Sequence, residues 1–182
     1  MHLSHRLPSL AVLAGLAATP AAAHVTLDLA EAPADSYVRV AIRVPHGCSG
    51  AATTGLRLQV PPGLRGVKPA PKPGWTLDIA PGEAGGAPAA SAASAASAAA
   101  AGEHGEGPTI KEVAWRGGPL PDDRFDEFLL LFRTPAAPGE TLWFPFVQEC
   151  EGGAVARWIE RPQPGQPRPA RPAWALRLVP KP

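Results

Sequence analysis

The sequence predicts an all-β protein, built as an immunoglobulin-like antiparallel β-sandwich with a flexible Ala/Ser-rich loop insertion. The 24 prolines and 19 glycines among 182 residues divide the chain into short segments. Several of these segments alternate apolar and polar residues, and few keep a helical period for more than two turns. A series of about eight short strands separated by turns is typical of a β-sandwich.

The individual strands follow from this alternation. Residues 36–44 place apolar side chains on one face and two arginines on the other, and residues 54–60 alternate in the same way. Pro145 lies inside the apolar segment 142–147, where we expect an edge position or a bulge, because proline donates no ladder hydrogen bond. Further strands are predicted at 75–79, 110–115, 125–132, 155–160 and 173–179.

The chain also divides by composition. Residues 1–23 have the basic start, apolar stretch and closing alanines of a secretory signal peptide, which is removed from the mature protein. We expect the sandwich over residues 24–161. The low-complexity insertion 82–107 interrupts it, since that stretch has no side chains large enough to form a core. Residues 162–182 form a proline-rich tail that ends in a strand.

Charge and motif content exclude several function classes. The formal net charge of +1 gives no electrostatic reason to expect nucleic acid or an acidic membrane surface as partner. No apolar run of about 18 residues follows the signal peptide, so we expect no membrane span in the mature chain. The sequence has no nucleophile elbow, phosphate-binding loop or metal-spaced histidine pair, and we predict no enzymatic activity. The expected location is the periplasm or the exterior of the cell.

Two cysteines support an exported protein. Cys48 and Cys150 are the only ones, and an even number in an exported chain favours a disulfide. A bridge between them would close most of the domain. The alternative is a dithiol site for copper or zinc, which an oxidising compartment disfavours because it removes thiolates.

His24 is the most informative residue for function. Cleavage after Ala23 would make it the first residue of the mature chain, and its α-amine and imidazole Nδ1 could then chelate one metal ion. Met1 is the only methionine, so the mature chain lacks the thioether ligands that Cu(I) prefers. Nitrogen and oxygen donors suit Cu(II) better. The alternative is an ordinary solvated terminus, because some residue must follow every cleavage site.

A series of short motifs carries a resemblance to a known family. In chain order they are HVTL at 24–27, VPHGC at 44–48, PKPGW at 71–75, VAW at 113–115, LPDD at 120–123, DEF at 126–128, FPFVQEC at 144–150 and RWIE at 157–160. This pattern resembles the YcnI-like family of exported copper-binding domains. The resemblance extends from residue 24 to about residue 161, apart from the Ala/Ser insertion.

The resemblance implies a Cu(II) site of the single-histidine brace type on an immunoglobulin-like sandwich. Matched by motif, the ligating histidine is His24, the helping glutamate is Glu127 and the tryptophan close to the metal is Trp158. Glu149 and Trp143 are the substitutes for the last two. His46, in the turn before Cys48, and Glu149 are further candidates for a place beside the ligands, although a purely structural role in the turn is the simpler interpretation of His46.

We therefore expect a protein that sequesters, delivers or senses Cu(II) in copper homeostasis. The resemblance implies other copper-trafficking proteins or a membrane copper transporter as partners. One alternative is a copper-dependent oxidase or monooxygenase that uses His24, but its usual second histidine could come only from His46 or His104. Another is a metal-free β-sandwich binding module, for which loss of His24 would change nothing.

Overall fold

The computed structural model describes residues 24–82 and 109–182, which are all-β apart from one 3₁₀ turn. The predicted signal peptide and almost all of the predicted insertion lie outside the described residues. The elements are β1 (Thr26–Leu27), β2 (Glu31–Pro33), β3 (Tyr37–Val44), β4 (Thr53–Gln59), β5 (Arg65–Pro69), β6 (Trp75–Pro81), β7 (Ile110–Leu120), β8 (Asp126–Arg133), β9 (Thr141–Phe144), β10 (Phe146–Cys150), η1 (Glu151–Gly153), β11 (Val155–Trp158) and β12 (Trp174–Val179).

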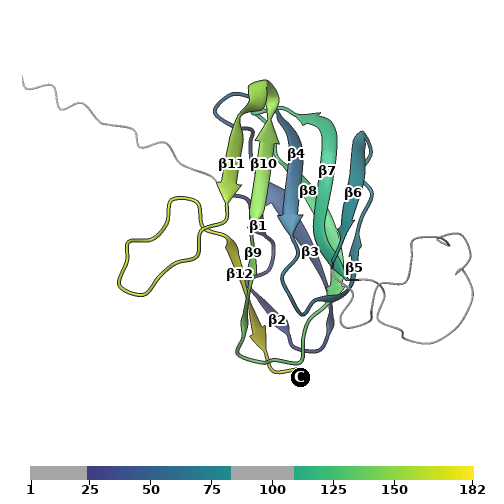
Figure 1. Cartoon of the computed structure of the whole chain (residues 1–182), viewed down its shortest axis with the longest axis vertical. Coiled ribbons are helices and arrows are strands. Elements are labelled where there is room, and N and C mark those ends of the chain that lie inside the picture. Colours follow the sequence, from purple (N-terminus) through teal and green to yellow (C-terminus); the bar gives the residue numbers. More distant parts are fainter. Residues whose placement is uncertain (1–23, 83–108) are drawn as a thin grey trace, which may run out of the picture.

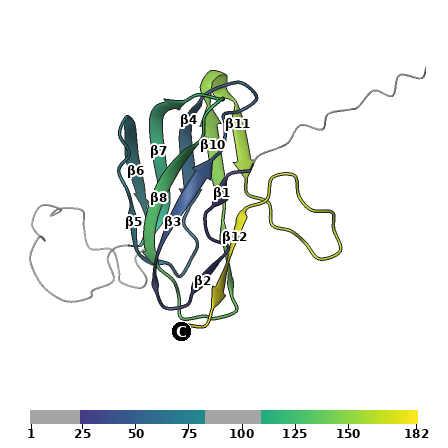
Figure 2. The same ribbon diagram turned by 180° about the vertical axis from the view of Figure 1, so that it is seen from behind.

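The strands form three sheets that enclose one core. A four-stranded sheet has the order β1-β3-β8-β5, a five-stranded sheet has the order β11-β10-β4-β7-β6, and a small sheet has the order β2-β12-β9. Figures 1 and 2 show the two larger sheets as facing layers, with the small sheet continuing the sandwich at one end. β1 is therefore one edge strand of the first of these layers, and β11 is one edge strand of the other. The predicted antiparallel sandwich is confirmed.

Aromatic side chains fill the space between the layers. Trp115, Phe128 and Phe146 are essentially inaccessible to solvent, and the first two are in ring contact at 5.4 Å between centroids. Burial of one such side chain contributes roughly 1.5–3 kcal/mol. The predicted alternation of β3 is confirmed as well, because its apolar residues are buried while Arg39 and Arg43 are exposed.

The predicted strand at 142–147 is wrong as a single element. The structure divides it at Pro145 into β9, which belongs to the small sheet, and β10, which pairs with β4 and β11 in the five-stranded sheet. A proline has no N–H for a ladder bond, so the chain can leave one sheet there and enter the other.

The last strand is an integral part of the sandwich. β12 pairs in antiparallel fashion with β9 and in parallel fashion with β2, so the sandwich continues to Val179, beyond the sequence-based boundary at residue 161. Residues 161–171 project from the body of the domain as a loop (Figure 1, yellow). Its neck is closed by a bridge between Glu160 and Pro172.

A disulfide joins the turn after β3 to the end of β10. Cys48 and Cys150 are bonded, with their Cα atoms 6.0 Å apart, and this confirms the predicted pair. No described cysteine is left as a free thiol for the dithiol metal site. In the described part of the chain, no helix has the length and apolar character needed to cross a membrane.

Candidate functional site at the start of the first strand

His24 lies where the two facing sheets meet at their edges. It lies two residues before Thr26, the first residue of β1, which pairs with Arg43 of β3. β1 contributes only two residues to the ladder and has no strand on its outer side. The histidine is half-buried there, with its backbone at the open edge of the sheet.

Trp158 packs against this histidine from the opposite sheet. It ends β11, pairs with Phe146 of β10 and keeps only 4% of its surface exposed. The ring centroids of His24 and Trp158 are 5.0 Å apart, and the ring planes are inclined by 54°. The structure thus brings together two of the three residues that the sequence predicted for one site.

The indole N–H of Trp158 differs from those of Trp115 and Trp174, which have backbone acceptors. Trp115 donates to the Ala70 carbonyl at 3.1 Å, and Trp174 donates to the Leu29 carbonyl at 2.9 Å. The Trp158 Nε1 is buried and has no hydrogen-bond partner among the described residues. Buried indole N–H groups normally find an acceptor, so an orphaned one beside His24 indicates a place where a ligand oxygen could be accommodated.

Glu127 lies on the same sheet as β1 but not beside His24 in the ladder. It is in register with Arg43 of β3, which in turn is in register with Thr26 of β1. The Arg43 guanidinium donates to the Glu127 carboxylate through Nε at 3.1 Å and Nη2 at 2.8 Å. Two strand spacings place the Glu127 backbone about 10 Å from that of Thr26. Its carboxylate therefore already has a cationic partner, which comes from the strand between β8 and β1.

The two remaining predicted residues have structural partners. The Glu149 carboxylate binds Arg57 at 2.8 Å and Arg116 at 2.9 Å on the outer face of the five-stranded sheet. It lies across Gly55, where a Cβ atom would come within 2.7 Å of its Oε2. His46 directs Nδ1 at the Gly47 carbonyl, 2.5 Å away. Neither side chain is in contact with His24.

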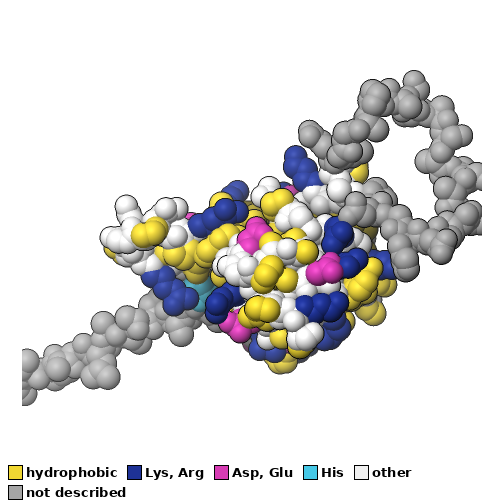
Figure 3. Space-filling view, turned by 90° about the horizontal axis from the view of Figure 1, so that it is seen from below, with side chains coloured by type: hydrophobic (Ala, Val, Ile, Leu, Met, Phe, Trp, Pro, Cys, Tyr) yellow, Lys and Arg dark blue, Asp and Glu magenta, His cyan; other side chains and the backbone are white. Residues whose placement is uncertain are grey.

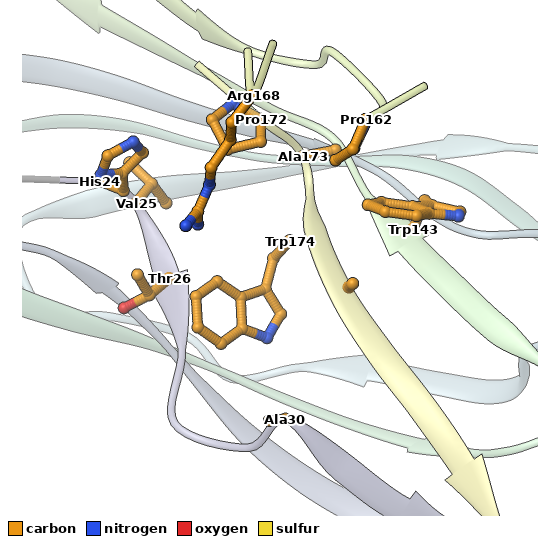
Figure 4. A pocket seen from close by; sticks show the side chains of 11 residues that line it. His24, Val25, Thr26, Ala30, Trp143, Pro162, Arg168, Pro172, Ala173 and Trp174 are labelled. Atoms are coloured by element: carbon orange, nitrogen blue, oxygen red, sulfur yellow. The ribbon is translucent and has the colours of Figure 1, made fainter. Parts of the chain in front are cut away.

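A pocket of about 490 Å³ opens beside His24. Figure 4 shows His24 at one side, Trp143 at the other and Trp174 between them. The full lining comprises His24, Val25, Thr26, Ala30, Trp143, Pro162, Arg168, Pro172, Ala173, Trp174 and Ala175. Trp143, the substitute tryptophan of the sequence prediction, thus shares the pocket with His24. The pocket could not be predicted from the sequence, since six of its eleven lining residues come from residues 162–175, far from His24 in the chain.

Arg168 is the cationic side chain that lines the pocket beside His24. Arg43, which is in register with Thr26, is already paired with the Glu127 carboxylate. Figure 3 shows Lys and Arg side chains, with Asp and Glu side chains among them, on the lower face of the molecule. A dication held there would be stabilised by an added anionic ligand, because like charges within a few ångströms repel.

The donor set fits a brace on one histidine better than a cage of side chains. In residues 24–82 and 109–182, no three His, Cys, Asp or Glu side chains gather closely enough to hold a metal. A brace on His24 needs only the α-amine and the imidazole of that residue, and both are nitrogen donors of the kind that Cu(II) prefers. Glu127 could join them only by exchanging Arg43 for the metal.

Comparison with known proteins agrees with the fold. A solved structure described as an uncharacterized protein from Nocardia farcinica with an immunoglobulin-like fold is 26% identical, with a TM-score of 0.62. The alignment covers 86% of this chain and 98% of that one. No curated protein matches the sequence. The family model of DUF1775, a domain of unknown function, matches residues 24–178, and the chain therefore belongs to the DUF1775 family.

Proposed function

We propose that this protein is an exported Cu(II)-binding protein of copper homeostasis, which sequesters or delivers copper through a single-histidine brace at His24. The contact between His24 and Trp158 carries the proposal. It places the predicted first residue of the mature chain against a buried tryptophan with an unsatisfied N–H. The DUF1775 match begins at the same residue, and the motifs within it resemble the YcnI-like family of copper-binding domains.

Each residue of the site has a distinct part in this proposal. The α-amine and Nδ1 of His24 would hold the metal in a six-membered chelate ring, and Trp158 would cover one side of it. Bound Cu(II) would supply a tetragonal centre with positions left for oxygen ligands. Trp158 restricts access of water to that side through its bulk. We assign binding and transfer rather than catalysis, because the sequence carries no catalytic motif.

Glu127 supplies charge balance in the proposal. Its side chain is 35% exposed and that of Arg43 is 51% exposed, so the ion pair between them is weak, worth about 0–1 kcal/mol. A metal with a charge of +2 can compete for the carboxylate at little cost. Binding of copper would then release Arg43 to solvent.

Tryptophan fluorescence offers a direct test. Cu(II) is paramagnetic and quenches nearby indoles, and the Trp158 ring lies 5.0 Å from that of His24. We expect one equivalent of Cu(II) to quench the protein that begins at His24. Trp158→Phe should remove most of this quenching while a competing chelator still reports tight binding. Trp143→Phe, across the pocket, is the matched control and should retain the quenching. Equal quenching of wild type and His24→Ala would overturn the proposal.

A further inference from the structure

The pocket beside His24 has the size and lining of a small-molecule site. Its volume of about 490 Å³ lies within the range of about 300–1,000 Å³ that is common for ligand pockets. Two tryptophans, Trp143 and Trp174, and two prolines, Pro162 and Pro172, provide most of its large side chains. Such a lining favours a flat apolar group, because aromatic rings pack well against indole and pyrrolidine faces.

The walls of the pocket are held in place before any ligand arrives. Trp143 and Trp174 come from the paired strands β9 and β12. The indole N–H of Trp174 donates to the Leu29 carbonyl at 2.9 Å, which fixes the orientation of its ring. The Pro162 and Pro172 side of the pocket is closed by the neck of the 161–171 loop. A preformed pocket loses little conformational entropy on binding.

Arg168 gives the pocket one cationic group. Figure 4 shows its guanidinium reaching down from the loop to lie between Val25 and Trp174. In the described part of the chain it has no acidic partner, and residues 161–171 contain three arginines and no Asp or Glu. A guanidinium presents a planar fork of donors that matches a carboxylate.

A second pocket of the molecule differs from this one in that one of its arginines has acidic partners. It has a volume of about 420 Å³ and is lined in part by Arg57, Arg157 and Glu112. There Arg57 already binds Glu149 at 2.8 Å and lies 3.6 Å from Glu112. Arg57 of this second pocket is thus already paired with carboxylates of the protein, whereas Arg168 of the pocket beside His24 has no acidic partner among the described residues.

We propose that the pocket formed by Trp143, Trp174 and Arg168 binds a small aromatic carboxylate. The Arg168 guanidinium holds the carboxylate, and the two indoles hold the ring. This site lies beside the metal site but does not depend on it, since the imidazole of His24 only closes one side of the pocket. A carboxyl-terminal aromatic residue of a peptide shares this chemistry, and the test separates the two sources.

Isothermal titration calorimetry on the purified protein, stripped of metal with EDTA, tests the proposal. Phenylacetate is the probe, phenylacetamide is the uncharged analogue and acetate lacks the ring. We expect saturable binding of phenylacetate at or below about 1 mM, at least about tenfold weaker binding of phenylacetamide, and no binding of acetate. A tetrapeptide ending in phenylalanine tests the peptide source, and the proposal expects it to bind more weakly than phenylacetate.

Two substitutions in one loop complete the test. Arg168→Gln should weaken phenylacetate binding at least about tenfold. Arg171→Gln, a matched change of a loop arginine that does not line the pocket, should alter it less than twofold. Trp143→Ala should weaken both aromatic probes alike. Equal binding of phenylacetate and phenylacetamide, equal effects of the two arginine changes, or tighter binding of the tetrapeptide would each overturn the proposal. None of these results depends on copper.

Discussion

His24 and His46 are both half-buried histidines close to the carboxyl end of β3, but the contacts of their side chains differ. His46 lies in a turn that is fixed by hydrogen bonds and by the disulfide. Its Nδ1 faces the Gly47 carbonyl, its own carbonyl accepts from Gln148 at 2.7 Å, and Cys48 is bonded to Cys150. His24 has a ring contact with Trp158 and no hydrogen bond to its imidazole among the described residues.

The difference separates a histidine that holds the fold from one that is free to hold a ligand. A ring nitrogen already engaged by a neighbouring carbonyl must give up that bond before it can bind a metal. The nitrogens of His24 have no such competitor. The following predictions sharpen this contrast by asking which region supports stability and which supports binding.

Removal of the disulfide should produce the largest change, because it releases the His46 turn. Cys48 and Cys150 are separated by 102 residues. The chain-entropy model gives about 4.7 kcal/mol for a loop of about 100 residues, and we expect the paired change Cys48→Ala with Cys150→Ala to lose up to that amount. Guanidinium unfolding measures it. A loss below about 1 kcal/mol would show that the turn is held without the disulfide.

Exchange of each histidine for alanine should separate the two roles. His24→Ala should lower the affinity for Cu(II) at least about a hundredfold, equivalent to about 2.7 kcal/mol, and leave thermal stability nearly unchanged. His46→Ala should leave the affinity within about twofold. Competition with a chelator of known affinity measures both. If His46→Ala caused the greater loss of copper, the assignment of the two histidines would have to be reversed.

The buried amide below the His46 turn should matter for stability alone. Gln148 is 2% exposed and donates to the His46 carbonyl at 2.7 Å and to the Thr53 hydroxyl at 2.8 Å. Gln148→Leu removes the donor to both acceptors, which should cost about 2 kcal/mol of unfolding free energy. The exposed Gln59→Leu is the control and should change stability by less than about 0.5 kcal/mol. Urea unfolding of the two variants distinguishes them.

The smallest effect is expected at Glu127. Glu127→Gln keeps the shape of the side chain but removes the charge that would offset Cu(II), so we expect about tenfold weaker binding, equivalent to about 1.4 kcal/mol. Glu31 pairs with Arg177 at 3.3 Å in the small sheet and provides a matched control. Glu31→Gln should leave copper affinity unchanged. Equal affinities for wild type and Glu127→Gln would remove Glu127 from the site.

The parts of the fold that the sequence predicted are those encoded by local alternation. The pattern of β3 sets which of its residues face the core, and it does so without reference to any other strand. β5 was missed because the sequence of Arg65–Pro69 contains no clear apolar alternation, and none of its residues is fully buried. The change of sheet at Pro145 was also missed, because the choice between two sheets depends on strands that lie far away in the chain.

The candidate site could likewise be predicted only where local sequence determines it. His24 could be identified from its position after the signal-like segment, and Trp158 only through the resemblance of its motif. The contact between Trp158 and His24 joins residues that are far apart in the chain, and no local sequence pattern predicts it. The engagement of Glu127 by Arg43 depends on the register between β3 and β8, which an alternating pattern constrains only to one face. Likewise, the walls of the pocket combine β9, β12 and a loop.

The most direct test of the copper site compares two versions of the protein, one beginning at His24 and one carrying a single additional alanine before it. The added residue leaves the imidazole and Trp158 in place but moves the free α-amine away from His24. Cu(II) titration followed by electron paramagnetic resonance measures the outcome. We predict tight binding with a nitrogen-rich axial spectrum only when His24 is the first residue. Equal binding and identical spectra for the two versions would contradict the proposed brace.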